Sequence, residues 1–197
     1  VIARPDLFPN PENPERGALI GCPAGWACQY INQNLYKAYD MEAKGWDLID
    51  PGSSAGLDAL ISKAVNDGTN LVTYYWAPTA ILGKLPMYML EPNATHDSDE
   101  WASCTAVADC ADPKPNAWGF SAVETVVTDN FSEEASVAMD YISTRDFDNA
   151  TMNSLLAWMA ENQATGEEGA IYYLENNEDN WSAWVSEAVK DRVLEAL

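Results

Sequence analysis

The stretch Gly21–Cys28 reads Gly-Cys-Pro-Ala-Gly-Trp-Ala-Cys and places a tryptophan inside a loop bounded by two cysteines. Pro23 lacks a backbone donor and has a restricted φ, while Gly25 permits a positive φ. A disulfide between the bounding cysteines would close a ring that holds Trp26 rigidly. This loop predicts either a ligand-binding tryptophan or a tryptophan that only packs beside a disulfide.

The residues that follow predict a helix over 29–39, because apolar side chains recur there at helical spacing. The backbone N–H groups of Ala27 and Cys28 are then expected at the N-terminus of this helix, where they can bind an anion. An aromatic face beside an anion-binding turn suits a zwitterion.

A second aromatic stretch, Asn70–Trp76, reads Asn-Leu-Val-Thr-Tyr-Tyr-Trp and predicts a strand that ends before Ala77 and Pro78. Trp76 is therefore expected at the C-terminal end of a strand. Ligands bind at that end of the strands in open α/β sheets.

The first half of the chain alternates strands and helices, which predicts an α/β fold with a largely parallel sheet flanked by helices. Ser53 or Ser54 is expected to cap the second helix, and Gly68 to end it. The expected order is strand 18–20, helix 29–39, strand 46–49, a second helix and strand 71–76.

Three segments are expected along the chain: an extended linker over 1–16, a ligand-binding α/β lobe over 17–116, and a C-terminal part over 117–197. Four prolines predict the linker, since proline is excluded from helix interiors and central strands. A long polar loop is expected at 91–116, short strands at 87–90 and 118–128, and helices at 79–85, 131–143, 149–162, 166–175 and 181–197.

Four cysteines form two Cys-x5-Cys pairs, Cys22 with Cys28 and Cys104 with Cys110. This spacing favours two local disulfides and an oxidising compartment. The alternative, a zinc site, usually has closer spacing and histidine partners, and His96 is the single histidine. The acids of the 91–116 loop lack the spacing of a calcium-binding loop, so we expect neither a metal nor a cofactor.

The chain carries 31 acidic and 10 basic residues, a formal net charge of −21. Such a charge repels nucleic acid and anionic membranes, so neither is an expected partner. No signal peptide or transmembrane run is visible, and the start at Val1 fits a mature or trimmed chain.

The two aromatic stretches, joined by Asp50–Leu57, resemble those of glycine betaine and proline betaine binding proteins, the substrate-binding subunits of ABC-type osmoprotectant importers. The resemblance extends from about Pro14 to the C-terminus. It implies that Trp26 and Trp76 form part of a tryptophan cage around a quaternary ammonium group, a cation–π arrangement. It also implies that the N–H groups of Ala27 and Cys28 hold the ligand carboxylate.

The same resemblance implies a type II-like periplasmic-binding-protein lobe, with the C-terminal helices belonging to the other lobe. Relatives carry a preceding segment that builds most of that other lobe and adds a cage aromatic and a carboxylate-binding side chain. Nothing in Val1–Arg16 matches that segment, so a fragment, or a remainder on another chain, is expected. The implied partners are a small quaternary ammonium ligand and a membrane permease, in the periplasm or outside the cell.

Two other functions are compatible with the composition of the chain. A secreted carbohydrate-active hydrolase would also combine tryptophans with acids, but no catalytic constellation stands out in the sequence. A non-binding fragment that associates with itself is a further alternative. Trp46, Trp158, Trp181 and Trp184 are predicted to pack in the core, whereas Trp101 and Trp118 are undecided.

Overall fold

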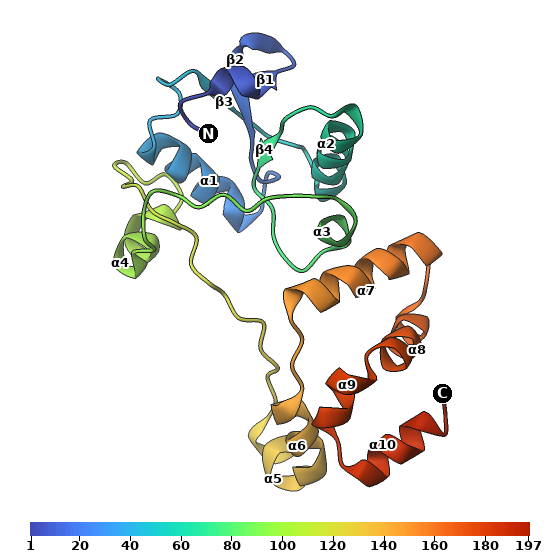
Figure 1. Cartoon of the computed structure of the whole chain (residues 1–197). Helices are drawn as coiled ribbons and strands as arrows, with labels where there is room; N and C mark the ends of the chain where they lie inside the picture. The colour runs from blue at the N-terminus through green and yellow to red at the C-terminus, as the bar shows by residue number, and fades with distance from the viewer. The chain divides into compact units, whose positions relative to one another are not determined.

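The computed structural model describes all residues from 1 to 197 and divides into two compact units. The first unit combines 1–76 with 85–120, and the second combines 77–84 with 121–197. All strands belong to the first unit, whereas the second is helical (Figure 1). The short segment 77–84 thus groups with the C-terminal helices and not with the α/β lobe, in which the sequence predicts it.

The sheet of the first unit is built around β2 (Asn13–Ile20). β3 (Trp46–Ile49) and β4 (Val72–Thr73) pair with it in parallel, and β1 (Pro9–Asn10) pairs with it antiparallel. The sheet is therefore mixed but mostly parallel, and the predicted α/β class is confirmed. β4 is shorter than expected and ends before the aromatic residues that follow it.

Two helices connect the parallel strands. α1 (Ala27–Ala38) starts two residues earlier than predicted. α2 (Ser54–Asp67) is capped by Ser53, whose hydroxyl accepts a hydrogen bond from the Gly56 amide at 3.0 Å, as the sequence predicted. The indole of Trp46 in β3 is completely buried and lies 5.6 Å from the ring of Phe8 between centroids, which confirms its packing role.

The N-terminal segment is part of the sheet and not the extended linker expected over 1–16. It contains a 3-10 turn, η1 (Pro5–Leu7), then β1 and the start of β2. Pro9 is tolerated in β1 because this strand lies at a sheet edge, where a missing N–H breaks no ladder bond. The Trp46 indole also donates to the Ile2 carbonyl at 2.9 Å, which ties down the end of the segment.

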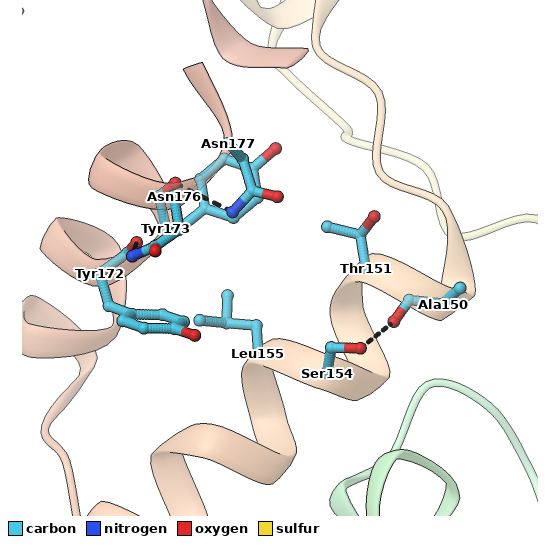
Figure 2. Close-up of a pocket in the computed structure, with 8 residues that line it drawn as sticks. All are labelled: Ala150, Thr151, Ser154, Leu155, Tyr172, Tyr173, Asn176 and Asn177. Atoms are coloured by element: carbon cyan, nitrogen blue, oxygen red, sulfur yellow. Dashed lines mark hydrogen bonds between the residues drawn. The ribbon is translucent and has the colours of Figure 1, made fainter. Parts of the chain in front are cut away.

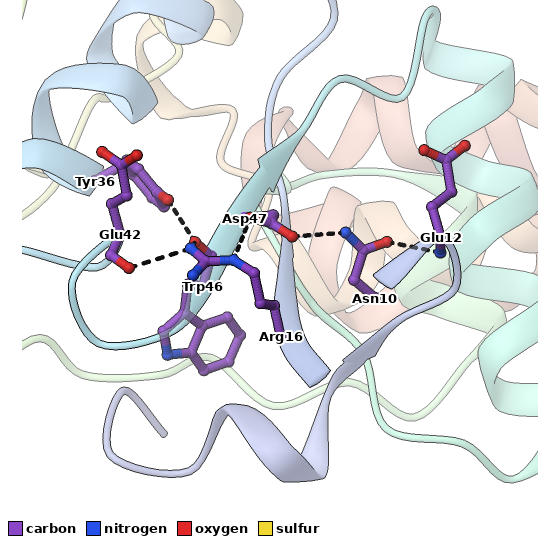
Figure 3. A network of polar contacts seen from close by, with 7 residues as sticks. All are labelled: Asn10, Glu12, Arg16, Tyr36, Glu42, Trp46 and Asp47. Atoms are coloured by element: carbon purple, nitrogen blue, oxygen red, sulfur yellow. Dashed lines mark hydrogen bonds and ion pairs between the residues drawn. The ribbon is translucent and has the colours of Figure 1, made fainter. Parts of the chain in front are cut away.

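A polar network fastens the same segment to β3 (Figure 3). The Arg16 Nε lies 2.6 Å from the Asp47 carboxylate, and the Asn10 side-chain amide donates to that carboxylate at 2.8 Å. Desolvation opposes ionisation of Asp47, but the hydrogen bonds from Asn10 and Arg16 outweigh it and lower its pKa. The network stabilises the ionised carboxylate and anchors β2 to β3.

The polar loop after residue 90 is more ordered than the sequence suggested. It contains α4 (Ser98–Glu100) and a π-helical turn, η2 (Trp101–Thr105), closed by the disulfide between Cys104 and Cys110. The buried Asn34 of α1 donates its side-chain amide to the carbonyls of this loop at 2.8 to 3.1 Å, the acceptors being Cys104, Thr105 and Val107.

The strands expected at 87–90 and 118–128 are not formed. Both stretches lack a partner in the sheet, and hydrogen-bonded pairing is what makes an extended chain a strand. In the second stretch the side chains of Phe120, Val123 and Val126 are more than nine-tenths exposed.

The second unit consists of short helices around an aromatic core. α3 (Ala80–Lys84) packs against α7 (Asn149–Asn162), and Tyr173, Trp181 and Trp184 form the buried cluster, which confirms that these two tryptophans pack. The expected helices at 131–143 and 181–197 are each interrupted. The remaining elements are α5 (Asp129–Glu134), α6 (Ser136–Thr144), α8 (Gly166–Asn176), α9 (Glu178–Trp181), η3 (Ser182–Trp184) and α10 (Glu187–Leu194). No helix of the protein combines the length and apolar character needed to cross a bilayer.

Candidate functional site

The cysteine loop presents Trp26 at the start of α1. The disulfide between Cys22 and Cys28 is formed, and Gly25 adopts a φ of 86°, which confirms both expectations for this loop. The Gly25 amide donates to the Gln29 side chain at 3.0 Å, so the loop is also tied to the first turn of the helix. Trp26 itself is 41% exposed and does not serve as a core residue.

The second predicted cage residue lies directly beside the first. The ring centroids of Trp26 and Trp76 are 5.4 Å apart, and their planes are inclined by 63°. Trp76 also contacts the ring of Tyr75, at 4.6 Å between centroids. The fold thus brings together two tryptophans that are distant in sequence, in the arrangement that edge-to-face aromatic pairs prefer.

The predicted backbone donors lie at the helix terminus next to this pair. α1 begins at Ala27 and has no side-chain cap, since its N-cap residue is Trp26. The amides of Ala27 and Cys28 find no acceptor within the chain. Free amides at the positive end of a helix dipole attract a negatively charged group.

Further rings continue from Trp76 across the first unit. We call Trp76, Tyr74, Trp118, Trp101 and His96 the aromatic row. Successive ring centroids along it are 6.3, 5.1, 5.0 and 5.3 Å apart. The sequence left Trp101 and Trp118 undecided, because only the folded 91–118 segment brings the Trp118 ring to Tyr74 and the Trp101 ring to Trp118.

The groups gathered in this region are aromatic rings and free backbone amides. Burial raises the pKa of Tyr74, so its hydroxyl stays neutral and its ring remains a π surface. No cluster of three or more His, Cys, Asp or Glu side chains is arranged to hold a metal ion. Neutral aromatic faces next to free amides can accommodate a compact cation and a carboxylate.

Two cavities lie in the second unit, away from the predicted site residues in sequence. One, of about 390 Å³, lies between α7 and α8 (Figure 2). Three of its polar side chains, those of Ser154, Asn176 and Asn177, donate to backbone carbonyls four residues earlier in the chain. The other, of about 470 Å³, is lined mainly by apolar side chains around Trp184. Neither contains a residue that the sequence singled out for ligand binding.

Comparison with known proteins identifies the same family of substrate-binding proteins that the two aromatic stretches of the sequence indicate. Residues 2–176 match the family described as the substrate-binding domain of ABC-type glycine betaine transport systems. No match was found among curated protein sequences.

Two solved structures share the fold at 15% sequence identity. One is lactococcal OpuAC in a closed, liganded conformation complexed with glycine betaine; its TM-score is 0.53, with 86% of this chain and 57% of that chain covered. The other is an ABC-transporter choline-binding protein in an unliganded semi-closed conformation; its TM-score is 0.54, with 100% of this chain and 62% of that chain covered. The chain thus spans about three-fifths of the length of these two structures.

Proposed function

This chain belongs to the family of substrate-binding domains of ABC-type glycine betaine transport systems, and on that premise we propose that it binds glycine betaine or a related quaternary ammonium osmolyte. The proposed cation site is the pair Trp26 and Trp76, and the proposed carboxylate site is the amides of Ala27 and Cys28. The family consists of receptors and not of enzymes, which favours binding over the hydrolase alternative.

The observation that carries the proposal is the contact between Trp26 and Trp76 beside the uncapped start of α1. A quaternary ammonium has no N–H to donate, so it is recognised through the faces of aromatic rings. Each such ring contributes about 0.5 to 2 kcal/mol, and several rings are needed for useful affinity. Two adjacent tryptophans and a neighbouring pair of amides match the two ends of a betaine.

Substrate-binding proteins of ABC importers deliver their ligand to a permease from the outer side of the membrane. We extend this to the present chain and propose a membrane permease as its partner and the periplasm or cell exterior as its location. Self-association stays a prediction, and light scattering over a range of concentrations tests it.

Calorimetric titration of glycine betaine, and separately of choline, into the intact chain tests the binding proposal. Saturable heat is expected for the unmodified chain, and Trp76→Ala is expected to lose it. Trp158→Ala is the matched control, because Trp158 stacks on Tyr172 in the second unit at 3.8 Å between centroids. Equal binding by the unmodified chain and Trp76→Ala would remove Trp76 from the site. No heat with either ligand would contradict the proposal for this chain.

A further inference from the structure

The aromatic row connects the proposed cage to the second disulfide loop. Trp76 lies beyond the last ladder residues of β4, and the final backbone bond of that strand is from the Tyr74 amide to the Ile20 carbonyl, at 3.0 Å. The orientation of the Trp76 indole therefore depends on the rings around it. Tyr74 is one of these, nearly parallel to Trp76 with 28° between their planes.

Tyr74 is held in turn by Trp118, whose ring centroid is 5.1 Å away. Trp118 is 42% exposed, so burial of apolar surface alone does not account for its position. Its other contact is edge-to-face with Trp101, at 5.0 Å and 66°. Trp118 thus bridges Tyr74 and the residue that opens η2.

The far end of the row is fixed by hydrogen bonds and by the disulfide. His96 Nδ1 lies 2.8 Å from the Ala117 carbonyl oxygen. The fully buried Asn116 exchanges two bonds with the backbone of Asp97, at 2.9 and 3.0 Å. The disulfide between Cys104 and Cys110 closes the same loop, and Asn34 fastens it to α1. The part of the loop that carries Trp101 and Trp118 is therefore rigidly supported.

We infer that Trp118 is a positioning residue for the cage: through Tyr74 it fixes the indole of Trp76, and the disulfide loop holds Trp118 in place. The second disulfide then has a role in the ligand site as well as in stability. The consequence for ligand affinity rests on the proposed function, but the effect on Trp76 can be measured without ligand. A preorganised ring loses less conformational entropy when a ligand binds, which is how positioning would raise affinity.

Fluorine NMR of the chain labelled with 5-fluorotryptophan tests the inference. Trp76→Phe assigns the Trp76 resonance by removing it. Trp118→Leu is expected to shift or broaden that resonance, whereas Trp118→Tyr, which keeps a ring, is expected to restore it. Tyr74→Leu removes the link while leaving Trp118 in place and is expected to act like Trp118→Leu. Trp158→Leu in the second unit is the control and should leave the Trp76 resonance unchanged.

Glycine betaine titrations of the same variants give the second readout. Affinity is expected to fall roughly 2- to 12-fold in Trp118→Leu and to stay near that of the unmodified chain in Trp118→Tyr. The double variant Cys104→Ser with Cys110→Ser is expected to perturb the Trp76 resonance in the same direction. An unchanged Trp76 resonance in both Trp118→Leu and Tyr74→Leu overturns the inference. A shifted resonance in a chain that binds no betaine supports the positioning role and contradicts the proposed function alone.

Discussion

The indoles of Trp26 and Trp76 form an edge-to-face pair, with 5.4 Å between centroids, although one follows β4 and the other precedes α1. Such pairs are favourable in themselves, by about 0.5 to 1.5 kcal/mol beyond the area they bury. The pair is consequently formed before any ligand arrives, so part of the ordering cost of binding is met in the folded chain.

Recognition of positive charge distinguishes a cation–π site from a merely apolar one. We expect the tert-butyl analogue of glycine betaine, which has the same shape but no cationic charge, to bind more weakly than glycine betaine. The loss should be about 1 kcal/mol or more, as expected for aromatic faces that sense charge. Competition calorimetry measures it. Equal affinity for the two compounds would contradict the assignment of Trp26 and Trp76 as a cation site.

The carboxylate of Asp47 links stability to pH. Its pKa lies below the ordinary value of 3.8 in the folded chain, so its contribution is fully present above that value and is lost as the pH falls through the folded pKa. We expect Asp47→Asn to cost about 1 kcal/mol of unfolding free energy at neutral pH. The difference from the unmodified chain should shrink below pH 3.8. Urea unfolding of both proteins between neutral pH and pH below 3.8 measures this difference in unfolding free energy. A difference that does not change with pH would mean that ionisation of Asp47 is not what stabilises the chain.

The Asn34 amide supports the second disulfide loop from α1. Asn34→Ala leaves three carbonyls, two of them in buried hydrogen bonds, with one donor fewer, so we expect a loss of about 2 kcal/mol of unfolding free energy and faster hydrogen exchange over η2. The exposed neighbour Gln33 provides the control, since Gln33→Ala should have little effect. Unchanged exchange over η2 in Asn34→Ala would show that the Asn34 amide is not needed to hold this loop.

In the second unit, the contact between α3 and α7 depends on Gly83. A Cβ at this position would lie 2.1 Å from the carbonyl oxygen of Asn153, so the helices can approach this closely only at glycine. We expect Gly83→Ala to cost about 1 to 3 kcal/mol and to increase hydrogen exchange in α3. Gly166→Ala is the control, because a Cβ at Gly166 meets open space. Similar stability of the two variants would mean that α3 can shift without cost.

Local sequence patterns were sufficient to predict much of the secondary structure of the first unit. The cap at Ser53 depends on residues close in sequence, and it was predicted correctly, as were the boundaries of β3. The strand expected at 118–128 depends on pairing with another segment, and no pattern within the stretch supplies that partner. β1 was missed for a related reason, since its prolines suggested a linker and only the pairing with β2 makes it a strand.

In the candidate site too, features set by neighbouring residues could be predicted from the sequence, whereas features set by contacts between distant residues could not. The cysteine loop could be identified from Gly25, Trp26 and the two cysteines, and the structure places Trp76 in contact with it. Trp118 could not be assigned, because its role depends on a contact with Tyr74 that only the folded loop creates. The proposed roles of Trp26 and Trp76 in ligand binding, and of Trp118 in positioning Trp76, stay predictions until the titrations are made.

The chain passes between the two units three times, after Trp76, after Lys84 and after Phe120. Neither unit is therefore one uninterrupted stretch of polypeptide. A gene fragment that encodes only 121–197 would lack α3, the helix that packs against α7. Dissection of this protein by simple truncation would thus yield an incomplete helical unit, and separate expression would need residues 77–84 rejoined through a designed linker.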